Sequence, residues 1–134
     1  MNTEKIITER LTIIPFERKY ITDRYIEWLN DPEVVQFSNQ RFQIHTIKSC
    51  EKYLETYNNS SNYFWAIIEQ FNNYGHIGNI NAYINLNHNT ADVGILIGNK
   101  QVWGKGYGFE AWNAVCEFLF NKKSIRKITA GTLT

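Results

Sequence analysis

The segment with the clearest chemical potential is rich in glycine and runs from Gln101 to Gly108, with the sequence QVWGKGYG. Its glycines alternate with larger residues and stand between a strand-like run and a helix-like run. Glycine lets a ligand approach the main chain closely. Consecutive N–H groups at a helix N-terminus bind phosphate through hydrogen bonds and the helix dipole. Because Lys105 adds a positive charge, we interpret the segment as a cradle for a phosphate or pyrophosphate.

Other glycine-rich phosphate loops fit this segment less well. The Walker loop needs a serine or threonine after its lysine, but Gly106 follows Lys105. The dinucleotide fingerprint G-x-G-x-x-G fits at Gly104 and Gly106 and has Phe109 in place of its third glycine. A nucleotide-binding domain with an atypical loop, and a turn whose glycines serve only the backbone, remain as alternatives.

The elements that must position this segment follow from hydrophobic periodicity. The order predicts one mixed α/β (α+β) domain over residues 1–134, with antiparallel strands in the middle and a strand–loop–helix–strand unit at the end. Thr46 is placed as a helix N-cap. Strands are predicted over residues 6–16, 63–69, 76–86, 91–97 and 125–133, and helices over 19–30, 46–57 and 109–121. The last helix is expected to bury Phe109, Trp112, Val115, Cys116, Leu119 and Phe120.

Three segments, in the same order along the chain, resemble the GNAT N-acetyltransferase superfamily. The spacing from Gln101 to Gly106 matches the signature Q/R-x-x-G-x-G/A, which in that superfamily holds the pyrophosphate of acetyl-CoA. The stretch from Trp103 to Ala111 resembles the form W-G-[KR]-G-[YI]-[AG]-x-E-A, which is usual in the branch related to the ribosomal-protein-alanine N-acetyltransferases. The segments Thr8 to Phe16 and Trp28 to Val34 resemble the first strand of that branch and the region after its first helix. The resemblance covers nearly the whole chain.

The resemblance implies acetyl-CoA as the acetyl donor and no metal. The N–H groups from Val102 to Gly108 would receive the pyrophosphate, and a main-chain N–H near Leu96 or Ile97 would polarise the thioester carbonyl. The strand before the loop is expected to carry a bulge and to part from the strand at 127–132, with pantetheine between them. The cofactor-binding residues are therefore expected to be Leu96, Ile97, Gln101, Val102, Trp103, Gly104, Lys105, Gly106, Tyr107 and Gly108.

Acetyl transfer needs a neutral amine, so some group must accept a proton. The resemblance places Asp92 where some members carry a general-base carboxylate, and we predict Asp92 as the catalytic residue. The alternative is a strand-edge carboxylate that bonds a turn. Glu69 is a weaker candidate, expected as a solvated strand end. His45, His76 and His88 are expected as surface histidines, and their spacing gives no metal site.

The acceptor side of the site is predicted from three residues. The resemblance places Trp28 and Arg41 near acceptor-binding loops, although core packing is the simpler role for Trp28. Tyr83 lies on the polar face of the strand over 76–86, where it would line the acceptor pocket or face solvent. We expect the acceptor to be a small molecule or peptide that carries a primary amine.

Composition limits the classes of binding partner and the cellular compartment that we expect. The net charge of +1 argues against general binding to nucleic acid or a membrane surface, although residues 98–134 hold six basic against two acidic residues. No apolar run is long enough for a membrane span, and the charged N-terminus does not resemble a signal peptide, so we expect a cytoplasmic protein. Cys50 and Cys116 are predicted as buried, reduced thiols.

In the family, a further helix and a last strand follow the strand predicted over 125–133. That helix often supplies the serine or tyrosine that protonates the leaving thiolate. The resemblance therefore predicts a C-terminally truncated fold whose open edge invites pairing with a second copy as a homodimer. The leading function is an N-acetyltransferase acting by direct transfer on an amino-sugar nucleotide or a protein N-terminus. The alternative is a non-catalytic acyl-CoA-binding or partner-binding module.

Overall fold

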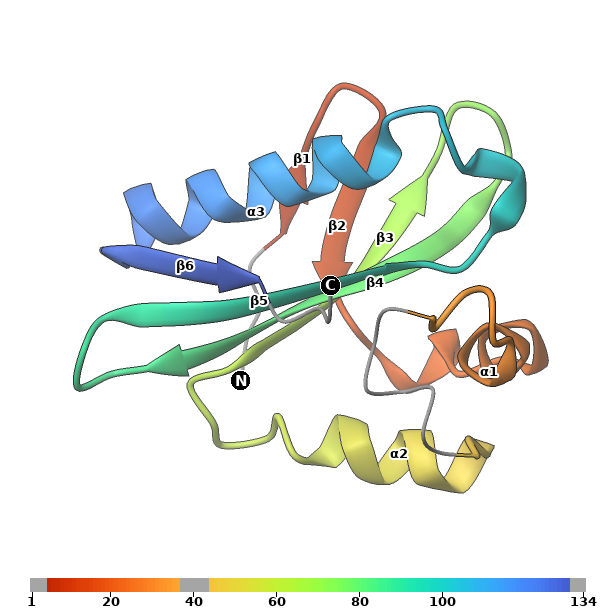
Figure 1. Cartoon of the computed structure of the whole chain (residues 1–134), viewed down its shortest axis with the longest axis horizontal. Coiled ribbons are helices and arrows are strands. Elements are labelled where there is room, and N and C mark those ends of the chain that lie inside the picture. The colour runs from red at the N-terminus through yellow and green to blue at the C-terminus, as the bar shows by residue number, and fades with distance from the viewer. Residues whose placement is uncertain (1–4, 37–43, 131–134) are drawn as a thin grey trace.

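One six-stranded sheet organises the computed structural model, which describes residues 5–36 and 44–130 (Figure 1). The strands lie side by side in chain order from β1 to β6. Neighbours are antiparallel from β1 to β5, whereas β6 runs parallel to β5. This mixed sheet confirms the predicted fold class. The strands are β1 (Ile6–Ile7), β2 (Leu11–Pro15), β3 (Tyr63–Glu69), β4 (Gly75–Asn85), β5 (Thr90–Ile97) and β6 (Lys127–Ala130).

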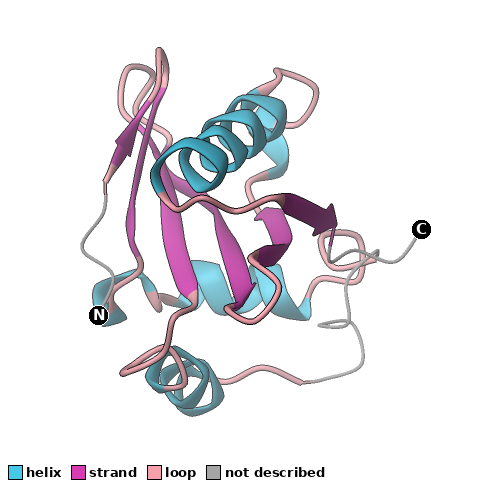
Figure 2. Cartoon of the chain, turned by 90° about the vertical axis from the view of Figure 1, so that its left-hand side faces the viewer, coloured by secondary structure: helices cyan, strands magenta, loops and turns pink. Residues whose placement is uncertain are grey.

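Helices cover both faces of the sheet. Helices α1 (Asp23–Asn30) and α2 (Ile47–Glu55) lie on one face, and α3 (Tyr107–Lys122) crosses the other (Figures 1 and 2). Alternate residues of β3 serve the two layers, because successive side chains of a strand point to opposite faces. Trp65 packs on the α3 side, and Phe64 on the side of α1 and α2. Within the described part of the chain, no helix is long and apolar enough to cross a membrane.

The first predicted strand, over 6–16, is in fact a hairpin. The N–H of Thr8 donates to the carbonyl of Leu11 at 2.9 Å, and the N–H of Leu11 donates to the Thr8 hydroxyl at 3.0 Å. Threonine forms such local bonds in competition with the sheet ladder, so the strand breaks here into β1 and β2. The turn carries Arg10 to the start of α3, where it becomes part of the site.

The helices before β3 follow the prediction closely. The predicted helix over 19–30 is a 3₁₀ turn (Arg18–Tyr20) followed by α1, whose N-cap Thr22 accepts the N–H of Tyr25. Helix α2 begins after the predicted N-cap, and the Thr46 hydroxyl accepts the N–H of Ser49 at 3.1 Å. Such a cap is worth about 1 kcal/mol of helix stability.

The buried face of α3 differs from the predicted one. The helix begins at Tyr107, two residues early, and Phe109 and Phe120 are 74% and 46% exposed, so their predicted inward orientation is wrong. Gly106 ends the preceding loop in a left-handed conformation and fixes where the helix starts. The buried stripe therefore follows the spacing i, i+4 from Tyr107, through Ala111 and Val115 to Leu119.

The bulge in the sheet lies one strand earlier than the family resemblance predicts. The β4–β5 pairing runs without interruption from Gly78↔Ile97 to Asn85↔Thr90. The register shifts instead between β3 and β4, where Ile77 is the extra residue of β4. The predicted bulge in the strand before the loop is therefore wrong. On its other edge β4 stays in register with β5, and there the carbonyl of Ile77 accepts the N–H of Gly98, the first residue after β5.

His76 is not the surface histidine that the sequence predicts. Its ring packs against those of four aromatic residues, with centroid distances of 5.1–6.0 Å to Phe16, Tyr20, Tyr25 and Trp28. Its Nε2 has no hydrogen-bond partner among residues 5–36 and 44–130. Burial lowers the pKa of His76 to about 4, because the imidazolium would lose its hydration.

We therefore expect acid to destabilise the fold through His76. The unfolded chain binds this proton near pH 6.5 and the folded chain only near pH 4, so stability is full above pH 6.5 and falls as the pH drops through that window. Urea unfolding should show a loss of about 2 kcal/mol from this group between pH 7.5 and 5.0. His76→Phe should remove most of that loss, and His88→Asn, at an exposed turn, should keep it. Equal pH dependence in both variants would contradict the assignment.

Candidate active site

The glycine-rich loop between β5 and α3 is anchored where it leaves the sheet. The N–H groups of Gly98 and Asn99 donate to the carbonyl of Ile77 at 2.9 and 3.2 Å. The Cα of Gly98 packs on the Trp28 indole so closely that an added Cβ would lie 2.0 Å from a ring carbon. The start of β4 and helix α1 therefore fix the start of the loop together.

The next residues form a 3₁₀ turn (Lys100–Val102) that uses its own N–H groups. The N–H of Gln101 donates to the Asn99 side chain at 3.0 Å, that of Val102 to the Asn99 carbonyl at 3.1 Å, and that of Trp103 to the Lys100 carbonyl at 3.2 Å. The predicted cradle included the N–H groups of Val102 and Trp103. Because both already have acceptors, the structure shortens the cradle at this end.

Six consecutive N–H groups follow, from Gly104 to Phe109. That of Lys105 closes the turn over Trp103 and Gly104, and the other five have no acceptor within residues 5–36 and 44–130. Gly104 and Gly106 have φ angles of +80° and +82°, a left-handed backbone that favours glycine. Helix α3 starts directly after Gly106, so the positive end of its dipole lies at these groups. The exposed Lys105 adds a cation. The arrangement suits an anion with several oxygens, as predicted for a pyrophosphate.

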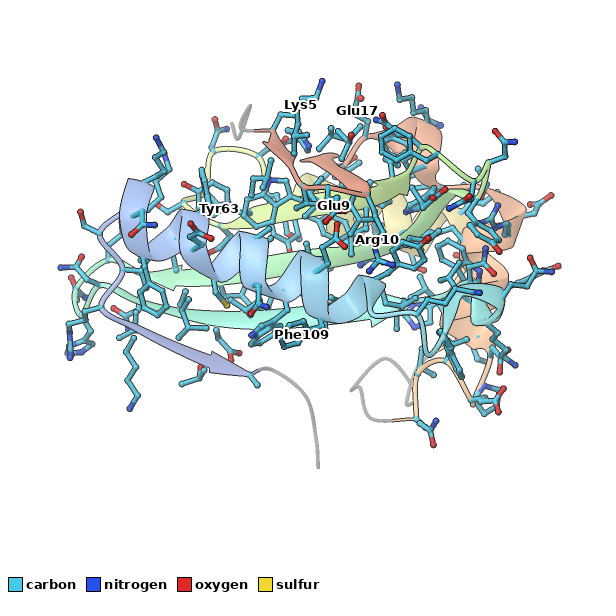
Figure 3. All side chains as sticks on the ribbon, turned by 90° about the horizontal axis from the view of Figure 1, so that it is seen from above. Lys5, Glu9, Arg10, Glu17, Tyr63 and Phe109 are labelled. Carbon is cyan, nitrogen blue, oxygen red and sulfur yellow. The ribbon has the colours of Figure 1, made fainter. Side chains whose placement is uncertain are left out.

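The far side of the loop is held by a cluster that the sequence did not reveal. The Arg10 Nη1 donates to the Lys105 carbonyl at 2.9 Å, and its Nε pairs with Glu110 Oε1 at 2.7 Å. Glu110 Oε2 accepts the N–H of Arg10 at 2.9 Å and the Thr8 hydroxyl at 2.5 Å. Figure 3 shows Arg10 beside the start of α3, with Phe109 on the opposite side of that helix. Only the match of the segment around Arg10 to a family strand hinted at a role.

The electrostatics of Glu110 agree with this pairing. Partial burial by itself would raise the pKa of Glu110, but the hydrogen bonds from Thr8 and Arg10 outweigh it and lower the pKa below its usual value. The sequence analysis did not single out Glu110 as a site residue. Its carboxylate instead ties the loop and helix α3 to the β1–β2 turn.

Within the described residues, strand β5 pairs with β6 along its first half only. This parallel pairing runs from Thr90↔Lys127 to Val93↔Ala130, the last residue that the structure describes. On that side, no strand among the described residues pairs with the rest of β5, which includes the half-buried Leu96 and Ile97. An unpaired strand edge offers N–H and C=O groups to an extended ligand. This is the place where the family resemblance locates pantetheine.

Asp92 lies just before the point where the pairing of β5 with β6 ends. Its side chain is exposed, and Oδ1 accepts the Thr129 hydroxyl at 2.8 Å. Its cross-strand partner on β4 is Tyr83, so the two side chains share one face of the sheet. The structure therefore places the predicted base beside a predicted acceptor residue, and its catalytic role stays a prediction.

Tyr83 belongs to a group of three tyrosines. The Tyr53 hydroxyl lies 2.5 Å from the hydroxyls of both Tyr57 and Tyr83, and the rings of Tyr57 and Tyr83 are nearly parallel. Burial raises the pKa of Tyr53 and of Tyr57, so both hydroxyls stay protonated near neutral pH. Tyr83 is 42% exposed. The spacing i, i+4 of Tyr53, on α2, and Tyr57, just after its end, is the signal of this group in the sequence.

Trp28 lines a groove of about 450 Å³ between α1 and the start of the loop. The residue itself is only 7% exposed and packs in the aromatic layer, as its simpler predicted role requires. The Lys100 ammonium closes one end through ion pairs with Asp31 at 2.8 Å and Glu33 at 2.7 Å. Arg41, the third predicted acceptor residue, lies outside the described residues. The groove is lined by Arg24, Glu27, Trp28, Asp31, Gly98, Asn99, Lys100 and Gln101.

The remaining candidates, Glu69 and the two cysteines, lie in places that suit a role in the fold. Glu69 is 1% exposed and accepts the N–H groups of Asn72 and Tyr74, so it closes a turn and is not the expected solvated strand end. Cys50 and Cys116 are free thiols, and burial raises the pKa of each, which disfavours the nucleophilic thiolate. The part of the chain that the structure describes holds no group of three or more His, Cys, Asp or Glu side chains arranged to bind a metal.

Comparisons with known proteins agree with this geometry. Solved structures with the same fold include a GNAT-family acetyltransferase from Bacillus anthracis, at 21% identity and a TM-score of 0.77, with 95% of this chain and 72% of that one covered. Another is the spermidine N-acetyltransferase from Vibrio cholerae in complex with CoA and spermine, at 19% identity and a TM-score of 0.75, with 92% and 71% covered. A search of the curated proteins gave no match.

A third similar structure is a Vibrio cholerae protein provisionally assigned as a ribosomal-protein-serine acetyltransferase, at 18% identity and a TM-score of 0.67, with 97% of this chain and 75% of that one covered. At these identities the likeness shows the fold alone. The sequence itself matches the family model described as the acetyltransferase (GNAT) domain, over residues 10–134. That match includes β2, the loop and helix α3, and it shows that the chain belongs to the GNAT acetyltransferase family.

Proposed function

We propose that the chain is an N-acetyltransferase that moves an acetyl group from acetyl-CoA to a primary amine. The observation that carries the proposal is the row of N–H groups from Gly104 to Phe109, which opens next to the end of β5 that no strand among residues 5–36 and 44–130 pairs on its β6 side. A pyrophosphate at the first and an extended pantetheine chain along the second match the two halves of CoA. Membership of the family supports the same donor.

The donor supplies an activated thioester, and the residues of this chain supply orientation and proton transfer. A backbone N–H near Leu96 or Ile97 would stabilise the oxyanion that forms from the thioester carbonyl. Asp92 would take a proton from the acceptor ammonium, directly or through water, and leave the neutral amine that attacks the thioester. As the new N–C bond forms, the C–S bond breaks, the thiolate leaves with the electron pair, and the second proton lost by the nitrogen passes to the thiolate through water.

The acceptor would approach from the face that carries α1 and α2. Asp92 and Tyr83 are exposed there, and the groove beside Trp28 lies on the same side. We keep amino-sugar nucleotides and protein N-termini as acceptor classes. Polyamines join them, because one similar structure holds spermine. A homodimer and a cytoplasmic location stay predictions.

The second candidate function is a non-catalytic module that binds acyl-CoA. A test that separates the two is thiol release from acetyl-CoA with a panel of amino-sugar nucleotides, short peptides and polyamines. An N-acetyltransferase should release one CoA thiol per acetylated amine with at least one of these acceptors. Binding of acetyl-CoA without turnover for any of them would favour the module.

The cradle itself can be tested at Gly106. We expect Gly106→Val to abolish acetyl-CoA binding in calorimetry, because a branched side chain at this left-handed position would strain the loop and press on Arg10, and so turn the N–H groups of the cradle away from the pyrophosphate. Gly75→Val is the matched control, since Gly75 also has a positive φ, at +66°, but lies outside the loop. Circular dichroism should show that both variants fold. Unchanged affinity in Gly106→Val would refute the cradle.

Asp92 can be tested separately from the cofactor site. We expect Asp92→Asn to lower kcat about 100-fold or more, the usual size of a general-base contribution, and to leave acetyl-CoA binding unchanged. Asp23→Asn, in the exposed first turn of α1, should change neither quantity. Wild-type kcat in Asp92→Asn would assign the proton transfer to another group.

A further inference from the structure

We propose that Arg10 is a positioning residue, which turns the peptide between Lys105 and Gly106 so that its N–H faces the pyrophosphate. The inference rests on the proposed function and concerns the same loop. Arg10 contacts the loop from the side of the β1–β2 turn, and its guanidinium donates to the Lys105 carbonyl at 2.9 Å. It would act on the ligand only through this peptide.

Peptide geometry makes this contact directional. In a trans peptide the C=O of one residue and the N–H of the next point in opposite directions, and no described peptide of this chain is cis. A carbonyl of Lys105 held against Arg10 therefore turns the N–H of Gly106 to the opposite side of the loop. That N–H is one of the groups without an acceptor within the described residues.

Arg10 can hold the carbonyl because it is itself fixed from three directions. Its Nε bonds Glu110 Oε1 at 2.7 Å, its own N–H bonds Glu110 Oε2 at 2.9 Å, and its guanidinium lies 4.2 Å from the ring centroid of Tyr107. A guanidinium offers several donors in one rigid plane, so it can bond a carboxylate and a carbonyl at once. A lysine ammonium on a flexible stem is a point charge without this fixed fork.

Charge gives Arg10 a second role at the same place. Glu110 lies in the first turn of α3, beside N–H groups that are to receive an anion. An unpaired carboxylate there would repel a pyrophosphate across a short distance. The ion pair with Arg10 offsets that charge and keeps it on the side of the β1–β2 turn.

The test compares two ligands that differ in the phosphates. We would measure the Kd of CoA and of pantetheine, which lacks the pyrophosphate and adenosine, for the wild type, Arg10→Met and Arg10→Lys. Both variants should bind CoA about tenfold more weakly, the usual cost of losing a hydrogen bond to a charged group, and should bind pantetheine as the wild type does. Arg18→Met is the matched control, because Arg18 pairs with Glu51 and makes no contact with the loop.

Each outcome has a defined meaning. Wild-type CoA affinity in Arg10→Met and Arg10→Lys would overturn the inference. Equal weakening of CoA and pantetheine would also overturn it, because Arg10 would then act only on the general stability of the fold. If the wild type itself binds CoA no better than pantetheine, the proposed cradle fails before Arg10 is considered. Should Arg10→Met not fold, Arg10→Lys alone decides, since it keeps the charge beside Glu110.

Discussion

The structure depends on keeping a row of backbone N–H groups unpaired at the start of α3. Free N–H groups are unfavourable unless water or a ligand satisfies them, so the surrounding contacts must hold the loop open. Three contacts, each from a different element, hold the loop open. The Ile77 carbonyl fixes the first residues, the Trp103 indole N–H donates to the Ile97 carbonyl at 2.8 Å, and Arg10 holds the Lys105 carbonyl. Each contact occupies a carbonyl that could otherwise accept one of the free N–H groups. Each also keeps the loop from changing conformation.

The two faces of the sheet support different parts of the candidate site. On one face, α3 buries the stripe that begins at Tyr107, and this packing fixes the direction of the helix dipole toward the loop. On the other face, the aromatic layer around Trp28 and His76 supports the groove and the start of the loop. Strand β5 belongs to both, because Asp92 faces the acceptor side while its last residues run into the cradle. In the proposed function, the donor and the acceptor would therefore meet at one strand.

Much of this could be predicted from the sequence because its signals are local. The spacing of Gln101, Gly104 and Gly106 indicated the loop, and the Thr46 cap placed α2. Apolar, aromatic and β-branched residues placed β3, and alternation placed β4. What escaped prediction depends on contacts between distant segments. The pair of Arg10 and Glu110 joins residues 100 positions apart, and no local pattern reports it.

The errors have the same physical origin. The buried face of α3 was assigned from hydrophobicity, which favours Phe109, whereas the left-handed Gly106 sets the helix start and turns that ring outward. His76 was assigned by the usual exposure of histidine, whereas four aromatic rings enclose it. The bulge was carried over from the family, whereas the pairing with β3 places it at Ile77. In each case tertiary packing outweighed a tendency of the residue type.

The most direct test of the cradle is amide NMR of the ¹⁵N-labelled chain during titration with CoA. The structure predicts large downfield shifts for the amide protons of Gly104 and of Gly106 to Phe109, as they begin to donate to phosphate oxygens. The amides of Val102 and Trp103, which already donate to backbone carbonyls, should move little. Saturating CoA that leaves Gly104 and Gly106 to Phe109 unshifted, or that moves Val102 and Trp103 most, would contradict the account.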